Sequence, residues 1–162
     1  MNLVEKLTDR WHGIDYPFLI HANGSLRFSE VANQHHVDLS EVKSGDVVAL
    51  IGDFDPKSIL TLLQLIDKNV ILVPLTIDTR SQHEYFFESA IVNVVIEGDQ
   101  VKRLKNNSKH ELIESLKSKE HAGLILFSTG TTGRPKAILH DLTLFMQRFE
   151  TPRPTLKTIN FL

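Results

Sequence analysis

The sequence predicts an α/β fold with a mainly parallel sheet and helices on both faces. Short apolar runs rich in Val, Ile and Leu recur between residues 45 and 150, and such unbroken runs are typical of parallel strands that are buried on both faces. Segments with helix-capping residues separate these runs, which is the alternation expected of strand–helix–strand units. The length of 162 residues suits one hydrophobic core, so we expect a single domain over residues 1–162.

Residues 45–150 form the alternating part. The predicted strands are Val47–Ile51, Val70–Val73 (closed by Pro74), Val92–Ile96 and Leu124–Phe127. The predicted helices begin at Asp55-Pro56, at a capping box of Ser81 and Glu84 (through about Ala90), at a second box of Ser108 and Glu111 (through about Ser118), and at Asp141 (Leu142–Phe149). Between the third strand and the second box, the polar and basic segment Gln100–Lys109 is expected to be a loop, with Lys102, Arg103 and Lys105 in solvent.

Residues 1–44 form a lead-in of another kind. Leu3–Trp11 is predicted to be a short helix with one apolar face. Asn23-Gly24 lies between two short apolar segments and is a strong signal for a β-hairpin turn. Ser29 is the expected N-cap of a helix through Gln34.

Composition excludes several classes of function. The formal net charge of −2 provides no basic field, so we expect no nucleic-acid partner. The chain has no cysteine, which excludes disulfides, thiolate catalysis and cysteine-based zinc sites. The eight histidines show no zinc-like spacing, and we expect no metal site. No apolar stretch is long enough for a membrane span and the start lacks the order of a signal peptide, so a cytoplasmic protein is expected.

The most informative segment is Ser128-Thr-Gly-Thr-Thr-Gly-Arg-Pro-Lys136, which directly follows the last predicted strand. A buried strand that ends in hydroxyls and glycines can turn its backbone N–H groups toward an anion. Gly130 and Gly133 let the backbone approach a ligand closely, and Lys136 supplies a point charge that suits phosphate. The remaining candidate ligands are the hydroxyls of Ser128, Thr129, Thr131 and Thr132. Arg134 is expected to point to solvent.

This segment differs from the Walker loop, because Pro135 and Ala137 stand where that pattern requires glycine and Ser or Thr. It resembles instead the phosphate loop of the adenylate-forming superfamily, which includes acyl-CoA synthetases, luciferases and peptide-synthetase adenylation domains. That loop reads Thr-Ser-Gly-Thr-Thr-Gly-x-Pro-Lys-Gly; here the first pair is swapped and Ala137 replaces the last glycine. Three earlier segments resemble the superfamily in the same order: Ser25–Val31, Val42–Val48 and Leu63–Leu75, where Asn69 replaces a glycine.

The resemblance implies that the chain is the N-terminal portion of the adenylate-forming large domain. Such an enzyme joins a carboxylic acid to ATP, with Mg²⁺, and gives an acyl-adenylate; CoA or a phosphopantetheine thiol then accepts the acyl group. In this reading, N–H groups around Gly130 and Gly133 hold the β- and γ-phosphates and Lys136 offsets the charge of the departing pyrophosphate. No catalytic residue is expected in this chain, because the adenine, ribose and catalytic-lysine motifs of the family do not occur in it, and we expect the chain alone to be inactive.

Two other functions remain open: a non-catalytic nucleotide- or phosphate-binding module, and an α/β domain that binds another protein. An expressed piece, a truncated gene product and half of a split enzyme are equally compatible with the sequence. The apolar end Leu156–Leu162 resembles a strand without a successor, which favours a homodimer. Tyr85, Phe86 and Phe87 are expected to pack in the core or against the missing part of the domain, and His140 to have a structural role.

Overall fold

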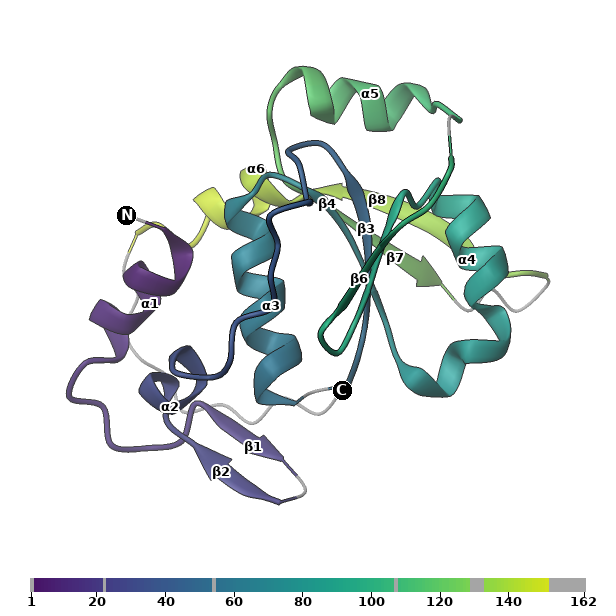
Figure 1. Cartoon of the computed structure of the whole chain (residues 1–162). Coiled ribbons are helices and arrows are strands. Elements are labelled where there is room, and N and C mark those ends of the chain that lie inside the picture. The colour runs from purple at the N-terminus through teal and green to yellow at the C-terminus, as the bar shows by residue number, and fades with distance from the viewer. Residues whose placement is uncertain (1, 22, 54, 107, 129–132, 152–162) are drawn as a thin grey trace.

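The computed structural model describes residues 2–21, 23–53, 55–106, 108–128 and 133–151 (Figure 1). The helices are α1 (Leu3–Trp11), α2 (Phe28–Ala32), α3 (Pro56–Asp67), the 3₁₀ helix η1 (Ile77–Gln82), α4 (His83–Ala90), α5 (Glu111–Ser118) and α6 (Leu142–Gln147). The strands are β1 (Leu19–His21), β2 (Gly24–Leu26), β3 (Val47–Ile51), β4 (Ile71–Leu75), β5 (Val94–Glu97), β6 (Gln100–Arg103), β7 (Gly123–Ser128) and β8 (Lys136–Asp141). The domain bounds of 1–162 stay a prediction, since residues 152–162 lie outside the described part.

A six-stranded sheet in the order β6-β5-β3-β4-β7-β8 is the centre of the structure. Its four inner strands are parallel to one another, as expected. Its two outer strands are antiparallel to their neighbours, so the sheet is mixed at both edges. All four predicted strands are present. The Val47–Ile51 strand has the predicted bounds, the ends of the other three are shifted by one to two residues, and the predicted α/β class with a mainly parallel sheet is confirmed.

Helices cover both faces of this sheet (Figure 1). On one face, buried residues of β3 and β4 such as Val48 and Leu72 pack with Leu65 of α3 and Leu142 of α6. On the other face, alternate residues of the same strands pack with α4 and α5 through side chains such as Phe86. Every residue of β3 is buried, which explains its unbroken apolar sequence.

Local signals set the bounds of α3. Asp55 is the N-cap and its side chain accepts hydrogen bonds from the N–H groups of Lys57 and Ser58, while Pro56 occupies the first turn. Past the C-cap Lys68, Asn69 has φ 53°, the left-handed conformation that asparagine tolerates better than most residues. The helix start at Asp55-Pro56 was expected from the sequence. Strand β4 then continues through Pro74, which was expected to close it; the proline fits because the pairing of β4 with β7 ends at Leu72.

The lead-in contains α1, the β1–β2 hairpin and α2. Leu19 pairs with Leu26 across the predicted hairpin, and Trp11 packs edge-to-face against Phe18 at 5.1 Å between ring centroids. The helix predicted after Ser29 begins earlier, because Arg27 occupies the N-cap position and its backbone N–H donates a hydrogen bond to the Glu30 carboxylate. Ser29 is therefore inside α2 and is not its cap.

Several other expectations were wrong. Gln100–Lys109 is not all loop, because Gln100–Arg103 forms the edge strand β6. Ser81 lies inside η1, and the N-cap of α4 makes no side-chain capping bond. His110, not Ser108, caps α5, and its Nδ1 accepts a hydrogen bond from the N–H of Leu112. Asp141 does cap α6 as predicted, but that helix ends at Gln147.

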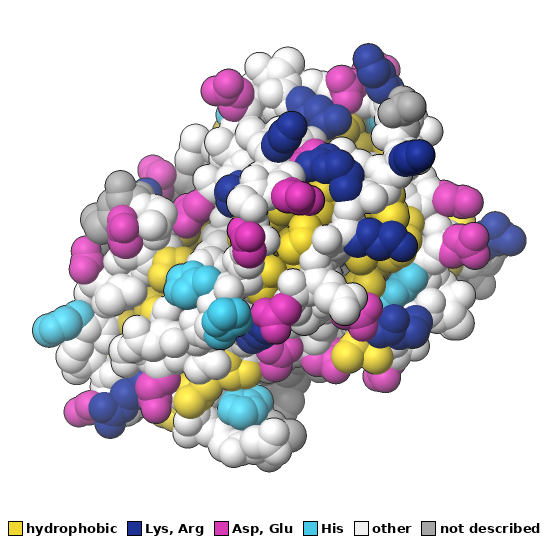
Figure 2. All heavy atoms as spheres, in the orientation of Figure 1, with side chains coloured by type: hydrophobic (Ala, Val, Ile, Leu, Met, Phe, Trp, Pro, Cys, Tyr) yellow, Lys and Arg dark blue, Asp and Glu magenta, His cyan; other side chains and the backbone are white. Residues whose placement is uncertain are grey.

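No described helix has the length and apolar character that a membrane crossing requires. On the face seen in Figure 2, acidic and basic side chains are interspersed, with apolar and histidine side chains between them. This face therefore has no large field of one sign.

Candidate phosphate-binding loop

The candidate loop joins the inner strand β7 to the antiparallel edge strand β8. Ser128 is the last residue of β7, Lys136 is the first of β8, and the two are directly opposite each other in the ladder. Lys136 was expected to lie in the loop; the pairing of the strands makes it part of β8 instead. The predicted residues Thr129, Gly130, Thr131 and Thr132 lie outside the described residues, so their roles stay predictions.

The described members of the loop stand at its two ends. Ser128 is half-buried, whereas Gly133 and Lys136 are exposed. Within the described part of the chain, Lys136 has no carboxylate partner within 4.0 Å. A Cβ built on Gly133 would meet no described heavy atom within 4 Å. Packing among the described residues therefore does not explain a glycine at this position, whereas close approach of a ligand would explain it.

Helix α4 contacts the exit of the loop. Phe86 stacks on Phe127 of β7 with ring centroids 4.1 Å apart, which fixes the helix against the sheet. The Tyr85 hydroxyl donates a hydrogen bond of 2.7 Å to the Pro135 carbonyl. The Arg134 guanidinium is exposed, as expected, but it lies over the Tyr85 ring, 5.4 Å from the centroid, and does not extend freely into solvent. Packing in the core or against the missing part of the domain was predicted for Tyr85, Phe86 and Phe87. Phe86 is buried and the other two are partly buried, and the polar contact of Tyr85 was not predicted.

The ends of the loop share one face of the sheet with exposed apolar side chains. Because successive residues of a strand point to opposite faces, Leu126 and Ser128 lie on the same face, together with their partners Ile138 and Lys136. Leu126 and Ile138 are 43% and 44% exposed. A ligand held by the loop on this face would thus have apolar surface beside it.

Two cavities lie outside the loop. The larger, about 430 Å³, is lined by residues of α1, α3 and α6, among them Leu7, Ile66 and Met146, and by none of the loop residues that the structure describes. The smaller, about 160 Å³, lies where β3 and β4 end, with Asp53, Ser58 and Thr76 among its lining. The position of the smaller cavity fits the general rule that ligands of open α/β sheets bind at the carboxyl ends of strands. The candidate loop also begins at the carboxyl end of its strand, β7.

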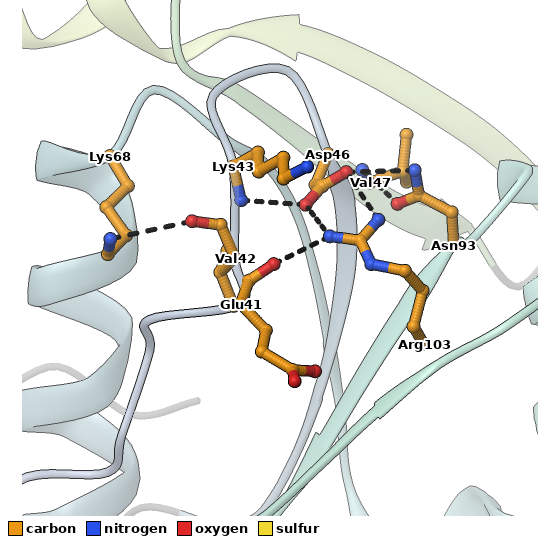
Figure 3. Close-up of polar contacts among 8 residues, drawn as sticks. All are labelled: Glu41, Val42, Lys43, Asp46, Val47, Lys68, Asn93 and Arg103. Carbon is orange, nitrogen blue, oxygen red and sulfur yellow. Dashed lines mark hydrogen bonds and ion pairs between the residues drawn. The ribbon is translucent and has the colours of Figure 1, made fainter.

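A charged cluster occupies the opposite end of β3 (Figure 3). The buried Asp46 carboxylate accepts hydrogen bonds from Arg103 Nη2 at 2.7 Å and Nη1 at 3.1 Å, from the Lys43 N–H at 2.8 Å and from Asn93 Nδ2 at 3.1 Å. Arg103 also donates to the Glu41 carbonyl at 2.7 Å, so the expectation that Arg103 is merely solvated was wrong. The cluster attaches edge strand β6 to the turn before β3.

The electrostatics of this cluster favour an ionised Asp46. Burial raises the pKa of this carboxyl, but the hydrogen bonds from Arg103, the Lys43 N–H and Asn93, with the Arg103 charge, more than offset this and hold the pKa below its ordinary value. The hydrogen bonds to Asp46 and the Asp46 charge raise the pKa of Arg103. The cluster lies at the amino end of the parallel strands, away from the loop, and its role is structural.

Some histidines make structural contacts, and others lie on the surface. His83 is buried, and its Nε2 lies 3.0 Å from the Thr76 carbonyl, to which it donates. His121 contacts the Asp141 carboxylate at 2.9 Å. His140, for which a structural role was expected, is exposed on β8 opposite Leu124. Among the described residues, no three His, Asp or Glu side chains converge as a metal site would require.

No protein-family model and no curated protein sequence matches the chain. Solved structures do. The N-terminal subdomain of Klebsiella oxytoca NpsA, in complex with anthranilyl-AMSN, is 19% identical with a TM-score of 0.61, over 93% of this chain and 43% of NpsA. VinN is 15% identical with a TM-score of 0.57, over 88% of this chain and 46% of VinN. An artificially fused NpsA–ThdA adenylation–PCP di-domain is 18% identical with a TM-score of 0.55, over 84% and 31%.

These matches concern the fold. The chain has the fold of the N-terminal part of adenylation domains, which confirms the structural side of the resemblance found in the sequence. The chain spans less than half the length of each of these structures.

Proposed function

We propose that this chain, whose fold is that of the N-terminal part of adenylate-forming enzymes, is the phosphate-binding portion of an ATP-dependent acid–thiol ligase. In the intact enzyme, a carboxylate oxygen attacks the α-phosphorus of ATP, and pyrophosphate leaves as acyl-AMP forms. The sulfur of a thiol, from CoA or a carrier phosphopantetheine, then attacks the acyl carbonyl, and AMP leaves. The carboxylic acid and the thiol are bound mainly by segments that this chain does not contain.

The observation that carries the proposal is the position of the Ser128–Lys136 sequence in this fold. The segment follows an inner parallel strand at its carboxyl end, where open α/β sheets bind ligands. Its order of hydroxyls, glycines and lysine matches the superfamily loop at the chemically important positions. A non-catalytic phosphate-binding module would use the same loop, so activity of the assembled enzyme is what separates the two functions.

The loop residues have distinct roles in this proposal. Backbone N–H groups around Gly130 and Gly133 donate to the β- and γ-phosphates, because a glycine backbone lets a phosphate come close. The hydroxyls of Ser128, Thr129, Thr131 and Thr132 add donors. Lys136 offsets the negative charge that grows on the departing pyrophosphate, and such fixed charge compensation is the main requirement of phosphoryl chemistry.

Mg²⁺ would enter this site together with ATP. Among the described residues, no three potential metal ligands come together, and we assign none of them to the ion.

Titration with inorganic pyrophosphate tests the loop directly. In an amide NMR titration of the full chain at constant ionic strength, we expect the largest shifts at Gly130, Thr131 and Gly133. Lys136→Ala should weaken binding by roughly tenfold, the value of about one charge-assisted hydrogen bond. Lys102→Ala is the matched control, because it removes the same charge from an exposed position of β6, at the opposite edge of the sheet. Equal effects of the two variants, or largest shifts elsewhere, would contradict the assignment.

ATP–pyrophosphate exchange tests the catalytic part. The chain alone should show none with any carboxylic acid, because half a site cannot orient the reactants. Exchange should appear when the chain is joined to, or mixed with, the downstream polypeptide of its own reading frame, and Lys136→Ala should reduce it. If that frame encodes no downstream adenylation segments, the binding-module function is favoured.

The proposed homodimer through Leu156–Leu162 falls outside the described residues. Light scattering on the 162-residue chain and on a chain that ends at Glu150 tests it, since only the longer chain should dimerise. A monomer in both would refute the dimer.

A further inference from the structure

We infer that Tyr85 is a positioning residue that orders the exit of the phosphate loop and so presets Lys136 for an anion. The inference rests on the proposed function of the loop and adds a residue from α4, far from the loop in sequence, to that site. Its effect passes through Pro135, whose carbonyl it binds, and through Arg134, which lies on its ring.

The first contact restrains the backbone. Tyr85 donates its hydroxyl to the Pro135 carbonyl at 2.7 Å, across a separation of 50 residues. This oxygen belongs to the peptide that leads into Lys136. The pairing of Lys136 with Ser128 holds the same point from the β7 side. The first residue of β8 is therefore held from two directions, by a strand and by a helix.

The second contact restrains a neighbouring cation. The Arg134 guanidinium lies 5.4 Å from the centroid of the Tyr85 ring, within the range of about 6 Å in which a cation is attracted to an aromatic face. Arg134 is exposed, so its side chain would otherwise sample many conformations in water. The ring thus keeps a second positive charge beside the loop, next to Gly133.

Helix α4 is held in place by other contacts and does not depend on the two contacts of Tyr85. Its buried residues are His83, Phe86 and Ala90, while Tyr85 is only partly buried. The stack of Phe86 on Phe127 anchors the helix to β7, the strand that enters the loop. Loss of the Tyr85 hydroxyl should accordingly leave the fold intact and change only the order of the loop exit.

The consequence for binding is that the loop exit loses less conformational entropy when an anion binds. A loop exit that is already fixed loses less freedom when an anion binds, and preorganisation of this kind increases affinity without a new contact to the ligand. A purely structural Tyr85 would instead lower the melting temperature and leave the affinity of the folded protein unchanged. Affinity and stability therefore separate the two roles.

The test uses the full chain, inorganic pyrophosphate, and three variants. Tyr85→Phe removes only the hydroxyl. Tyr85→Leu removes the ring as well. Tyr16→Phe is the control, because no hydrogen bond from the Tyr16 hydroxyl occurs within the described residues and its ring packs on Trp11, in the lead-in. Pyrophosphate affinity, the amide shifts of Arg134 and Lys136 in the free protein, and the melting temperature are measured for each.

Tyr85→Phe should weaken pyrophosphate binding about three- to tenfold, which is the range of one hydrogen bond. It should change the amide chemical shift of Lys136 in the free protein, while the melting temperature stays within about 2 °C of the wild-type value. Tyr85→Leu should weaken it further, and Tyr16→Phe should change neither quantity. If Lys136→Ala binds pyrophosphate more weakly while Tyr85→Phe binds it as tightly as the wild type, the inference about Tyr85 is wrong and the proposed function of the loop is supported. If the wild type binds no pyrophosphate, the proposed loop function fails, and this inference fails with it.

Discussion

Replacement of Asp46 by alanine should destabilise the protein by about 2–3 kcal/mol at neutral pH. The carboxylate accepts four hydrogen bonds, and its side chain is only 9% exposed. The bonds from the Lys43 N–H and from Asn93 are partly buried neutral-donor bonds, each worth about 1 kcal/mol. The Arg103 side chain is 41% exposed, so water replaces much of its pairing and we count about 1 kcal/mol for both of its bonds together.

A double-mutant cycle makes this estimate testable. Arg103→Ala alone should cost about 1–1.5 kcal/mol, because it also removes the bond to the Glu41 carbonyl. The double variant should lose less than the sum of the single losses by about 1 kcal/mol, which is the energy of the direct pair. Urea unfolding followed by far-UV circular dichroism measures all four proteins, and for a chain of this size the Asp46→Ala loss corresponds to roughly 4–12 °C in melting temperature.

Two results would refute this reasoning. Strict additivity of the two substitutions would mean that Asp46 and Arg103 do not interact in solution. A loss below about 0.5 kcal/mol for Asp46→Ala would mean that the buried carboxylate is no better bonded in the folded protein than in water.

Three further outcomes follow from the structure. The contacts of Asp46 and Asp141 depress the pKa values of these carboxyl groups. Their contribution to stability is therefore present at neutral pH and is lost as pH falls below about 4. The stability difference between the wild type and Asp46→Ala should shrink in acid, and unfolding curves at pH 7 and pH 3 measure this. Gly123→Ala should cost about 1–3 kcal/mol in urea unfolding, because the new Cβ would lie 3.0 Å from side-chain atoms of Ile71 and Leu116. Gly133→Ala should leave stability unchanged within about 0.5 kcal/mol yet weaken pyrophosphate binding, and weakened folding with unchanged binding would reverse the assignment of this glycine.

The parts of the fold that the sequence predicted well depend on local signals. The Val47–Ile51 run is apolar at every position because both faces of that strand are covered, and Asp55-Pro56 carries its capping information in neighbouring residues. Edge strands lack such signals. Gln100–Arg103 has one apolar residue, Val101, among three polar ones, and Lys136–Asp141 becomes a strand only through its partner β7. The sequence alone therefore indicated neither strand.

The candidate site divides in the same way. The loop residues form a contiguous pattern, and a pattern can be recognised in a sequence. Contacts between distant residues form no such pattern. Tyr85, which contacts the loop exit, is 50 residues from Pro135, and Arg103 of the structural cluster is 57 residues from Asp46. Topology brings these pairs together, and neither partner has a composition or spacing that indicates the other.

The hairpin that contains the loop has a consequence for the electric field at the anion. Many phosphate loops lead directly into a helix, whose aligned peptide dipoles place about half a positive charge at the ligand. Here the chain leaves the loop into β8, and neighbouring strands add little net dipole. Apart from the N–H groups of the loop itself, the positive potential must therefore come from side-chain cations, so binding should decline steeply as salt screens Lys136 and Arg134, more steeply than at a loop backed by a helix.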